Sequence, residues 1–337
     1  MRWILAGWTA ASILFAAVPA HSESFTYLQQ WGTFGPANGQ FNGPQGIAFR
    51  LNELYVADSQ NHRIQVFTAD GTFLRKFGMW GTGNGQFKSP WGVGVDSQGN
   101  IYVADRYNHR IQKFTSAGTY VTQWGTFGTL PGEFSNPWNV AVDYNDIVYV
   151  AEYDGHRVQR FTTDGAWIDV WGEFGTLPGQ FKNPRGIGFS PDGYVYIAGS
   201  GDDRIQKFDS DGAYILEWGG VHGSEPGQFH HPNGLTVDGD GFVYTLCWYA
   251  HPHGGRIQKF TPWGQYLGET GGIQGTGNGQ YDHAQGLAVT PSGLVIVSDH
   301  YNHRIQTLIQ NASTSVDGDI PLQSWGRIKQ GYRTTPR

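Results

Sequence analysis

One polar sequence recurs along the chain at a nearly fixed period. VADSQNHRIQVF at residues 56–67 returns as VADRYNHRIQKF at 103–114, VAEYDGHRVQRF at 150–161 and VSDHYNHRIQTL at 297–308. Measured at the arginine of each RIQ-like tripeptide, the spacings are 47, 47, 47, 52 and 48 residues, between Arg63, Arg110, Arg157, Arg204, Arg256 and Arg304. Six copies at this period predict an array of units that share their cores with neighbours, rather than independent domains.

Each copy contains four strand-like runs separated by turns. In the second copy the first run lies at the end of the segment GQFKSPWGVGV (85–95). The other three are IYVAD (101–105), RIQKF (110–114) and TYVTQWG (119–125). Because side chains alternate along a strand, Ile111 and Phe114 point to opposite faces, so both faces of the sheet are covered. Radial stacking of like sheets meets this requirement and leaves little exposed edge. The sequence therefore predicts an all-β fold, a six-bladed β-propeller of four-stranded antiparallel blades.

The repeated pattern P-x-G-[IV], then YVAD, then NHR-[IV]-Q-x-F, closely resembles the NHL repeat. The resemblance covers roughly residues 25–326 and implies an NHL-type propeller, which we place at residues 23–326, with a C-terminal tail at 327–337. Two runs resemble an outermost strand that would close the ring: FTYLQQWG at 25–32 and IPLQSWG at 320–326. The sequence thus contains six copies of each of the first three strands but seven candidates for the fourth. The sequence leaves open which run completes the last blade.

Residues 1–22 have the features of a secretory signal peptide. One basic residue precedes an apolar run from Trp3 to Val18, and small residues surround a cleavage point after Ala20 or Ser22. We therefore expect a secreted or periplasmic protein, with no transmembrane segment beyond the signal peptide. Without Arg2 the chain has 21 basic and 28 acidic residues, a formal charge of −7, which disfavours nucleic acid as a partner. Cys247 is the only cysteine, so no intramolecular disulfide forms, and we expect a monomer.

The repeated cluster of Asp58, Asn61, His62 and Arg63 has two interpretations. A histidine near an aspartate resembles an acid–base pair. Alternatively, the aspartate accepts hydrogen bonds from the arginine and from loop amides, and so ties strands or blades together. Multiple equal copies around a ring argue against one active site, so we favour the structural interpretation.

Function is expected where the copies differ, above all inside the P-x-G turn at the channel. The occupants of that position are Gln45, Trp91, Trp138, Arg185, Asn233 and Gln285. Tryptophan and arginine offer stacking surfaces, and amides offer directional hydrogen bonds. We predict that these residues bind ligand, together with the rim aromatics Tyr107, Tyr153 and Trp248. The alternative is that Trp91 and Trp138 only fill the channel.

Histidines outside the repeat gather in the fifth and sixth copies. His231 and His283 each stand one residue before the P-x-G turn or its A-x-G equivalent, and His251 and His253 lie in an insertion at 245–255. These four form a candidate metal site, for zinc or calcium, because neutral imidazoles ligate such transition metals as zinc. The alternative is that they are ordinary loop histidines.

Two functions follow from these sites. We favour a non-catalytic scaffold that binds a peptide, glycan or protein through the loop-rich channel face. The alternative is a metal-dependent lyase or hydrolase. The repeats are distantly similar to peptidyl-hydroxyglycine amidating lyases, and that resemblance implies zinc-binding histidines in the P-x-G turn, where this chain has none. The metal-binding carboxylate and asparagine set of lactonase-type propellers has no residue-by-residue match here either.

Overall fold

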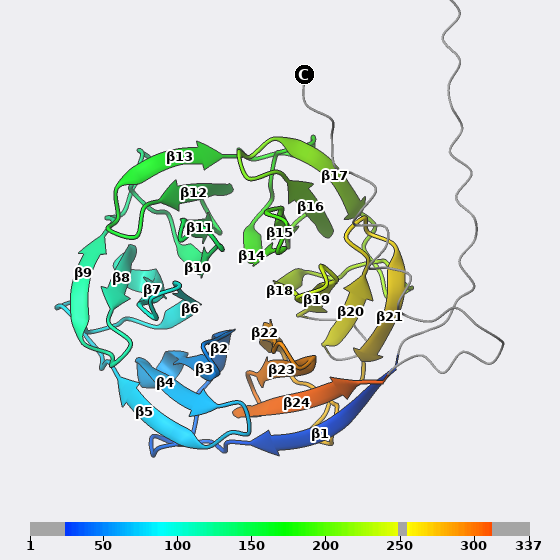
Figure 1. The fold of residues 1–337 in the computed structure, drawn as a ribbon, viewed down its shortest axis with the longest axis horizontal. Helices are drawn as coiled ribbons and strands as arrows, with labels where there is room; N and C mark the ends of the chain where they lie inside the picture. Colours follow the sequence, from blue (N-terminus) through cyan, green and yellow to red (C-terminus); the bar gives the residue numbers. More distant parts are fainter. Residues whose placement is uncertain (1–23, 249–254, 312–337) are drawn as a thin grey trace, which may run out of the picture.

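The structure, a computed structural model, describes residues 24–248 and 255–311. Six four-stranded antiparallel sheets surround a central axis like the blades of a wheel (Figure 1). The innermost strands are β2, β6, β10, β14, β18 and β22, and the outermost are β5, β9, β13, β17, β21 and β1. The predicted all-β, six-bladed propeller is therefore confirmed.

Blades 1 to 3 follow one another along the chain, each from its inner to its outer strand. Blade 1 contains β2 (Pro44–Arg50), β3 (Glu53–Asp58), β4 (Arg63–Thr68) and β5 (Phe73–Phe77). Blade 2 contains β6 (Pro90–Val95), β7 (Ile101–Asp105), β8 (Arg110–Phe114) and β9 (Tyr120–Trp124). Blade 3 contains β10 (Pro137–Val142), β11 (Val148–Glu152), β12 (Arg157–Phe161) and β13 (Trp167–Trp171). Two short 3₁₀ turns, η1 (Ser59–Asn61) and η2 (Arg106–Asn108), link the second and third strands of blades 1 and 2.

Blades 4 and 5 keep this order, and blade 6 borrows its outer strand from the other end of the chain. Blade 4 contains β14 (Pro184–Phe189), β15 (Val195–Gly199), β16 (Arg204–Phe208) and β17 (Tyr214–Gly219). Blade 5 contains β18 (Pro232–Val237), β19 (Val243–Cys247), β20 (Arg256–Phe260) and β21 (Tyr266–Gly271). Blade 6 contains β22 (Ala284–Val289), β23 (Leu294–Asp299), β24 (Arg304–Gln310) and β1 (Phe25–Trp31).

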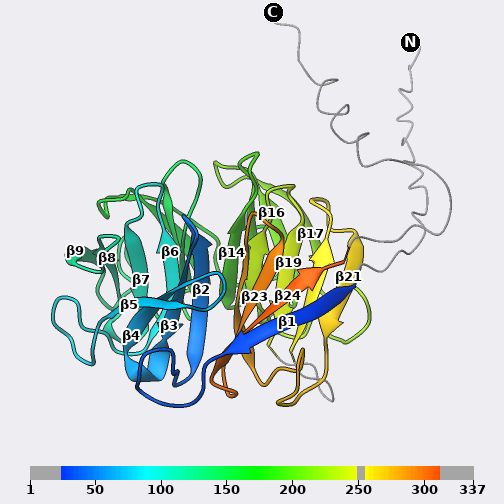
Figure 2. The same ribbon diagram turned by 60° about the horizontal axis from the view of Figure 1, so that its bottom comes forward.

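The N-terminal run at 25–32 is the one that closes the ring. Strand β1 pairs antiparallel with β24, from Phe25 opposite Gln310 to Trp31 opposite Ile305, so the ends of the described chain meet in one sheet (Figure 2). The other candidate, residues 320–326, lies outside the described residues, as do the expected signal peptide at 1–22 and the tail at 327–337. In the part of the chain that the structure describes, no helix has the length and hydropathy needed to cross a bilayer.

The hydrophobic core lies between neighbouring blades. Phe114 packs into the cluster that joins blades 1 and 2, whereas Ile111 belongs to the cluster that joins blades 2 and 3. This is the two-sided coverage that their alternating positions predict. In blades 1 to 5 the phenylalanine of the GQF or GEF segment is fully buried and packs on the last phenylalanine of its own third strand, as Phe87 does on Phe114 with ring centroids 5.5 Å apart. In blade 6 the buried Tyr281 takes this place. The loop entering each blade is thus anchored by the core.

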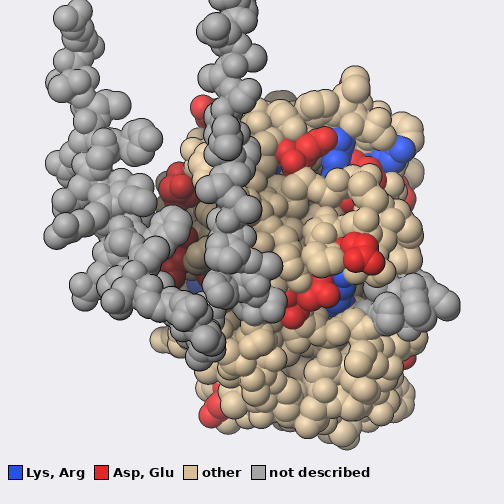
Figure 3. Space-filling view, turned by 90° about the vertical axis from the view of Figure 1, so that its right-hand side faces the viewer, with Lys and Arg blue, Asp and Glu red and all other residues tan. Residues whose placement is uncertain are grey.

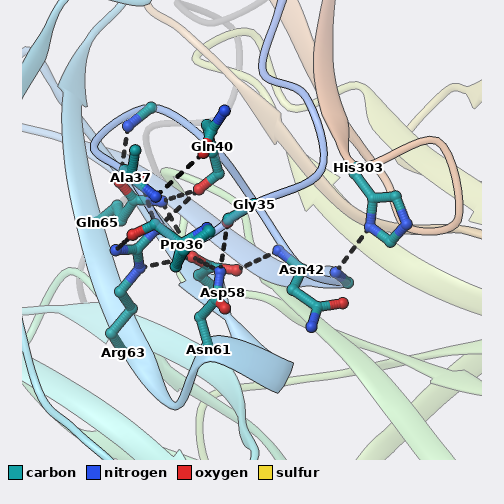
Figure 4. A network of polar contacts seen from close by, with 12 residues as sticks. Gly35, Pro36, Ala37, Gln40, Asn42, Asp58, Asn61, Arg63, Gln65 and His303 are labelled. Atoms are coloured by element: carbon teal, nitrogen blue, oxygen red, sulfur yellow. Dashed lines mark hydrogen bonds and ion pairs between the residues drawn. The ribbon is translucent and has the colours of Figure 1, made fainter.

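The repeated polar cluster is a structural joint, as we favoured from the sequence. Asp58 accepts hydrogen bonds from Arg63 Nε at 2.7 Å, Asn61 Nδ2 at 2.9 Å and the backbone amide of Asn42 at 2.7 Å (Figure 4). Arg63 donates its remaining hydrogen bonds to carbonyl oxygens of the entering loop, those of Pro36, Ala37 and Gln40. The joint therefore fixes the loop that leads into each blade.

Two further repeated side chains complete the joint. The glutamine of each RIQ segment accepts a loop amide and donates to a loop carbonyl; Gln65, for example, accepts from Gly39 and donates to Gln40. The histidine, in the left-handed backbone conformation, reaches the next blade: His62 Nδ1 accepts the amide of Ser89 at 3.1 Å. The last blade does the same to the first, because His303 Nδ1 accepts the amide of Gly43. These histidines link blades around the ring.

Blade 4 rebuilds the joint from different residues. Gly199 stands where blades 1, 2, 3 and 6 have Asp or Glu, and Asp202 supplies the carboxylate instead, 2.8 Å from Arg204 Nε. A β-carbon on Gly199 would lie 2.0 Å from Asp202 Oδ1, so the missing side chain makes room for this carboxylate. Asp203 takes the place of the histidine and accepts the amide of His231. Both aspartates have partners at this rim, since Asp202 pairs with Arg204 and Asp203 lies 2.7 Å from His222 Nδ1.

We predict that removing one carboxylate of the joint strongly destabilises the propeller. Asp105→Ala leaves Arg110 buried without its partner at 2.8 Å, and breaking a buried pair in this way costs about 3–5 kcal/mol. The control is Asp164→Ala, whose carboxylate is 91% exposed; that variant should stay within about 0.5–1 kcal/mol of the parent. Denaturant unfolding measures both. A cost at Asp105 no larger than at Asp164 would contradict the structural role of the joint.

Candidate functional site

A β-bulge at the start of each inner strand directs one side chain toward the axis. In blade 1, Pro44 pairs with Asp58 and Ile47 with Val56, so the two residues between them have no ladder partner. Such a bulge re-aims a side chain. The register shifts at this place in all six blades, and the side chains concerned are Gln45, Trp91, Trp138, Arg185, Asn233 and Gln285. All six line the central channel at one end.

Glycine in the bulge lets neighbouring inner strands approach closely. A β-carbon on Gly46 would lie 2.5 Å from the carbonyl oxygen of Trp91, and one on Gly286 would lie 2.6 Å from that of Gln45. Side chains at these two positions would separate adjacent blades. The bulge residues consequently crowd together at the channel end.

A second set of side chains meets the first from the loops between second and third strands. These residues directly follow the joint carboxylate, or the residue in its place, and they are Ser59, Arg106, Tyr153, Ser200, Trp248 and His300. We call these six, together with the six bulge residues, the hub. Sequence reasoning identified Tyr153 and Trp248 but missed Arg106 and His300, which an alignment of the six copies at Asp58, Asp105, Glu152 and Asp299 would have found. Tyr107, which we grouped with the rim, stands one position later and is 54% exposed.

Blades 2 and 3 contribute an interleaved stack of tryptophan and arginine. The guanidinium of Arg106 lies 3.8 Å from the ring centroid of Trp91 and 4.6 Å from that of Trp138. The two tryptophan rings meet edge to face with centroids 3.8 Å apart. Arg106 Nε donates to Asn136 Oδ1. Both tryptophans are half-buried, so they fill part of the channel end and still present ring surface to it.

Arg185 extends the stack into blades 4 and 5. Its guanidinium lies 4.2 Å from the ring centroid of Trp138, 4.9 Å from that of Tyr153 and 5.2 Å from that of Trp248. Trp138 and Tyr153 are themselves stacked, with centroids 4.6 Å apart. Arg185 is buried, and burial lowers the pKa of its guanidinium. The result is one positive charge enclosed by three aromatic faces, a favourable cation–π arrangement.

The remaining side of the hub is made of amides and one histidine. Gln45 Nε2 lies 3.1 Å from His300 Nδ1, and Asn233 Nδ2 donates to Gln285 Oε1. His300 is 7% exposed, and burial lowers the pKa of its imidazole to about 4. A neutral imidazole beside a carboxamide provides hydrogen bonds without charge. The hub therefore has an aromatic, positively charged side and a neutral, amide-rich side.

The channel behind the hub is large enough for a small molecule. Its volume is about 540 Å³, within the range of about 300–1,000 Å³ typical of ligand pockets. The opposite end is lined by the turns between first and second strands, including Arg50, Tyr144 and Asp238. The side chains that differ among the blades thus lie along one continuous cavity.

Of the four histidines in the predicted metal site, the structure describes His231 and His283. His231 Nδ1 lies 2.7 Å from the carbonyl oxygen of Ser200, and His283 Nδ1 lies 2.7 Å from Asp282 Oδ1. Trp248 packs near both, with centroids 6.3 Å from the ring of His231 and 5.3 Å from that of His283. His251 and His253 fall outside the described residues. Among the residues that are described, no three His, Cys, Asp or Glu side chains are grouped so as to hold a metal ion.

Cys247 stands in blade 5 at the position of the joint carboxylate. It is fully buried, and burial raises the pKa of its thiol to about 11, so it remains neutral. The nearby Arg256 pairs with Glu269 on β21 instead. Cys247 therefore packs as a small apolar side chain.

We predict that stability falls in mild acid because of His300. The folded pKa of about 4 lies below the ordinary value of 6.5, so the contribution is complete above pH 6.5 and is lost as the pH falls toward 4. Replacing His300 with Gln should reduce the fall in unfolding free energy between pH 7 and pH 4 by roughly 2–3 kcal/mol. Denaturant unfolding at both pH values measures it. His222→Gln, at an imidazole that is 55% exposed, is the control; an equal effect there would contradict the assignment.

Comparison with known proteins identifies the repeat. The model of the NHL repeat matches residues 41–67, 87–114, 134–161 and 281–308. Over 50 residues the chain is 42% identical to "Protein brain tumor" of Drosophila melanogaster and 42% identical to the B-box type zinc finger protein ncl-1 of Caenorhabditis elegans. Each alignment covers 14% of this chain, but only 5% and 6% of the respective relative. The likeness to these proteins is therefore confined to a small part of their length.

Solved structures share the fold at low identity. A gluconolactonase from Xanthomonas campestris matches with a TM-score of 0.58 and 16% identity, over 81% of this chain and 88% of its own. Virginiamycin B lyase from Staphylococcus aureus matches with a TM-score of 0.57 and 15% identity, over 85% and 99%. A protein of unknown function from Bacteroides thetaiotaomicron matches with a TM-score of 0.65 and 16% identity, over 86% and 77%. At such identities the likeness shows the fold alone.

The repeat matches and the ring of six sheets agree. Each of the four matched segments begins at the aromatic residue of its GQF-like segment and ends at the last core residue of its third strand, within blades 1, 2, 3 and 6. Blades 4 and 5 have the same strand order with altered loops. The chain therefore carries NHL repeats, and its six repeated units form a six-bladed β-propeller.

Proposed function

We propose that this propeller is a binding module that holds a peptide, glycan or protein partner at the channel end formed by the hub. The observation that carries the proposal is the convergence of Trp91, Trp138, Tyr153 and Trp248 around Arg106 and Arg185. Aromatic and arginine side chains dominate binding energy at protein interfaces. Rings that are half-buried are held in place by packing and still have surface available for a partner.

The division of labour in the repeat supports this proposal. The repeated polar residues are used by the joint, in which their hydrogen bonds run to loops and to the next blade. The bulge residues take no part in the joint, and four residue types (Gln, Trp, Arg and Asn) occur at this position among the six blades. Variation at a position that the fold leaves free is typical of a binding surface on a rigid scaffold.

Charge favours a partner other than nucleic acid. The full chain has 22 basic and 28 acidic residues. On the side of the molecule in Figure 3, acidic and basic side chains lie near one another on a largely uncharged surface, and no extended basic patch is visible there. Nucleic acid binding relies on such a patch.

We also propose that the protein is exported, on the strength of the apolar run at residues 3–18 and the small residues that follow it. We predict that expression in a bacterial host with an intact export pathway gives a mature protein in the periplasm or medium, beginning after Ala20 or Ser22. Fractionation and N-terminal sequencing measure this. Replacing Leu5 and Leu14 with Arg interrupts the apolar run and should retain the protein in the cytoplasm; equal export of that variant would contradict the proposal.

We predict that Trp138→Ala weakens partner capture. Its ring contacts both Arg106 and Arg185, so its loss removes stacking surface and opens the arrangement; loss of a central aromatic anchor costs about 2 kcal/mol or more. Peptide and glycan arrays probed with the purified protein identify bound compounds, and titration of the best one measures the loss. Trp263→Ala is the control, because that ring is 61% exposed on a turn between third and fourth strands, at the opposite face.

Two outcomes would contradict the binding-module proposal. One is identical capture by the parent and by Trp138→Ala, provided both keep the same thermal midpoint. The other is stoichiometric zinc or calcium in the purified protein that is lost, together with turnover of a substrate, when His231 and His283 are replaced by Ala. The second result would instead favour the metal-dependent lyase or hydrolase.

A further inference from the structure

Arg185 is a buried charge without a counter-ion in the described chain. Its side chain is 5% exposed overall, and its Nε has no hydrogen-bond partner there. No carboxylate of the described residues forms an ion pair with it. Its neighbours are the rings of Trp138, Tyr153 and Trp248, which attract a cation but do not neutralise it.

The other arginines show how unusual this is for the protein. Eight of the eleven arginines in residues 24–248 and 255–311 pair with a carboxylate: Arg63, Arg75, Arg110, Arg157, Arg160, Arg204, Arg256 and Arg304. The three without one are Arg50, Arg106 and Arg185. Arg50 and Arg185 line the channel from opposite ends, and Arg106 packs on the tryptophans that line it. Unpaired positive charge is thus concentrated at the cavity.

Arg106 and Arg185 also act on one another. Both stack on the ring of Trp138, with guanidinium-to-centroid distances of 4.6 Å and 4.2 Å, so two like charges share one aromatic ring. None of the twelve hub residues is acidic. An arginine stays protonated under all ordinary conditions, so neither guanidinium loses its positive charge to relieve the repulsion. An anion entering the hub would relieve both the repulsion and the cost of burying Arg185.

We propose that the hub binds the carboxylate of a small, ring-shaped organic acid, with Arg185 as the anion-binding residue. The guanidinium fork matches a carboxylate with two parallel hydrogen bonds. The flanking rings of Trp138, Tyr153 and Trp248 pack against the face of the ligand's ring, and the channel of about 540 Å³ admits a molecule of that size. This inference rests on the proposed function, since it names the ligand chemistry of the same site.

The experiment compares matched charged and neutral probes on the intact protein at low salt. Glucuronate is paired with glucose and benzoate with benzamide, while inorganic phosphate tests charge without a ring. Tryptophan fluorescence and calorimetric titration measure binding. We expect at least one carboxylate to bind about tenfold or more tightly than its neutral partner and more tightly than phosphate, and to raise the thermal midpoint.

Two arginine variants locate the site. Arg185→Gln should weaken carboxylate binding about tenfold or more, with little change for the neutral partner. Arg50→Gln is the matched control, because it removes an equally unpaired charge from the other end of the channel; binding should stay within about twofold. Arg185→Lys keeps the charge but loses the fork and should bind more weakly than the parent. Should Arg185→Gln fail to fold, the probe pairs on the parent protein decide the question.

Four results would overturn the inference. Equal binding of a carboxylate and its neutral partner would show that charge is not recognised; if Trp138→Ala then still abolished binding, the aromatic binding module would stand without the anion site. Phosphate binding as tightly as the carboxylates would show that no ring is recognised. Equal losses in the Arg185 and Arg50 variants would place the effect outside the hub. Absence of binding by every probe at millimolar concentration would remove the anion site while leaving partner capture on arrays to be judged separately.

Discussion

The propeller depends on a buried arginine–carboxylate pair that lies, in five of its six blades, at the end where the chain enters. The arginine alone would be a buried charge, and its loop would lack partners for several carbonyl groups. Asp58 neutralises Arg63 through its Nε, and the other two nitrogens of the guanidinium donate to the carbonyl groups of Pro36, Ala37 and Gln40. Blade 4 shows that the requirement is for a carboxylate at a place in space, because Asp202 supplies it where Gly199 has no side chain. In blade 5 Cys247 stands at that place, and Arg256 pairs with Glu269 on the outer strand, as Arg204 of blade 4 also does with Glu217.

This joint explains why the variable residues lie where they do. It holds the entering loop from one side, and the buried phenylalanine of the GQF segment anchors it from the other. The bulge that follows, with the residue after its proline unpaired, is therefore fixed in position without using its own side chain. A side chain that is not needed to hold its own rigid backbone in place is suited to binding a ligand, because little conformational entropy is lost on binding. The hub brings six such positions to one point.

Much of this arrangement follows from the sequence, and the failures have physical causes. The period gives the number of blades, and the apolar residues on both faces of RIQKF require neighbours on both sides. Ring closure stayed open because FTYLQQWG and IPLQSWG carry the same outer-strand pattern, and pairing with β24 is a property of the closed ring rather than of either segment. We grouped Tyr107 with Tyr153, but the residue of blade 2 that corresponds to Tyr153 is Arg106. In a tight turn, a shift of one residue moves a side chain from the hub to the surface. The role of Asp202 could not be predicted either, because the sequence does not reveal that Gly199 leaves space for a carboxylate three positions later to fold inward.

The contrast between the joint and the hub bears on function. Arg63 and Arg185 are about equally buried, at 5% exposure each, yet only Arg63 has a carboxylate. A cation–π contact is worth about 0.5–2 kcal/mol, whereas an uncompensated buried ion costs several. Three aromatic faces therefore offset part of the cost of burying Arg185 and leave the rest in place. Elsewhere the chain neutralises a buried arginine with Asp, with Glu or, in blade 4, with an aspartate three positions further along. The same fold could therefore place a carboxylate next to Arg185, but none of the hub residues is acidic. The joint arginines around the ring have carboxylate partners, whereas Arg185 at the channel has none among the described residues. This arrangement suits a scaffold whose ligand supplies the missing negative charge.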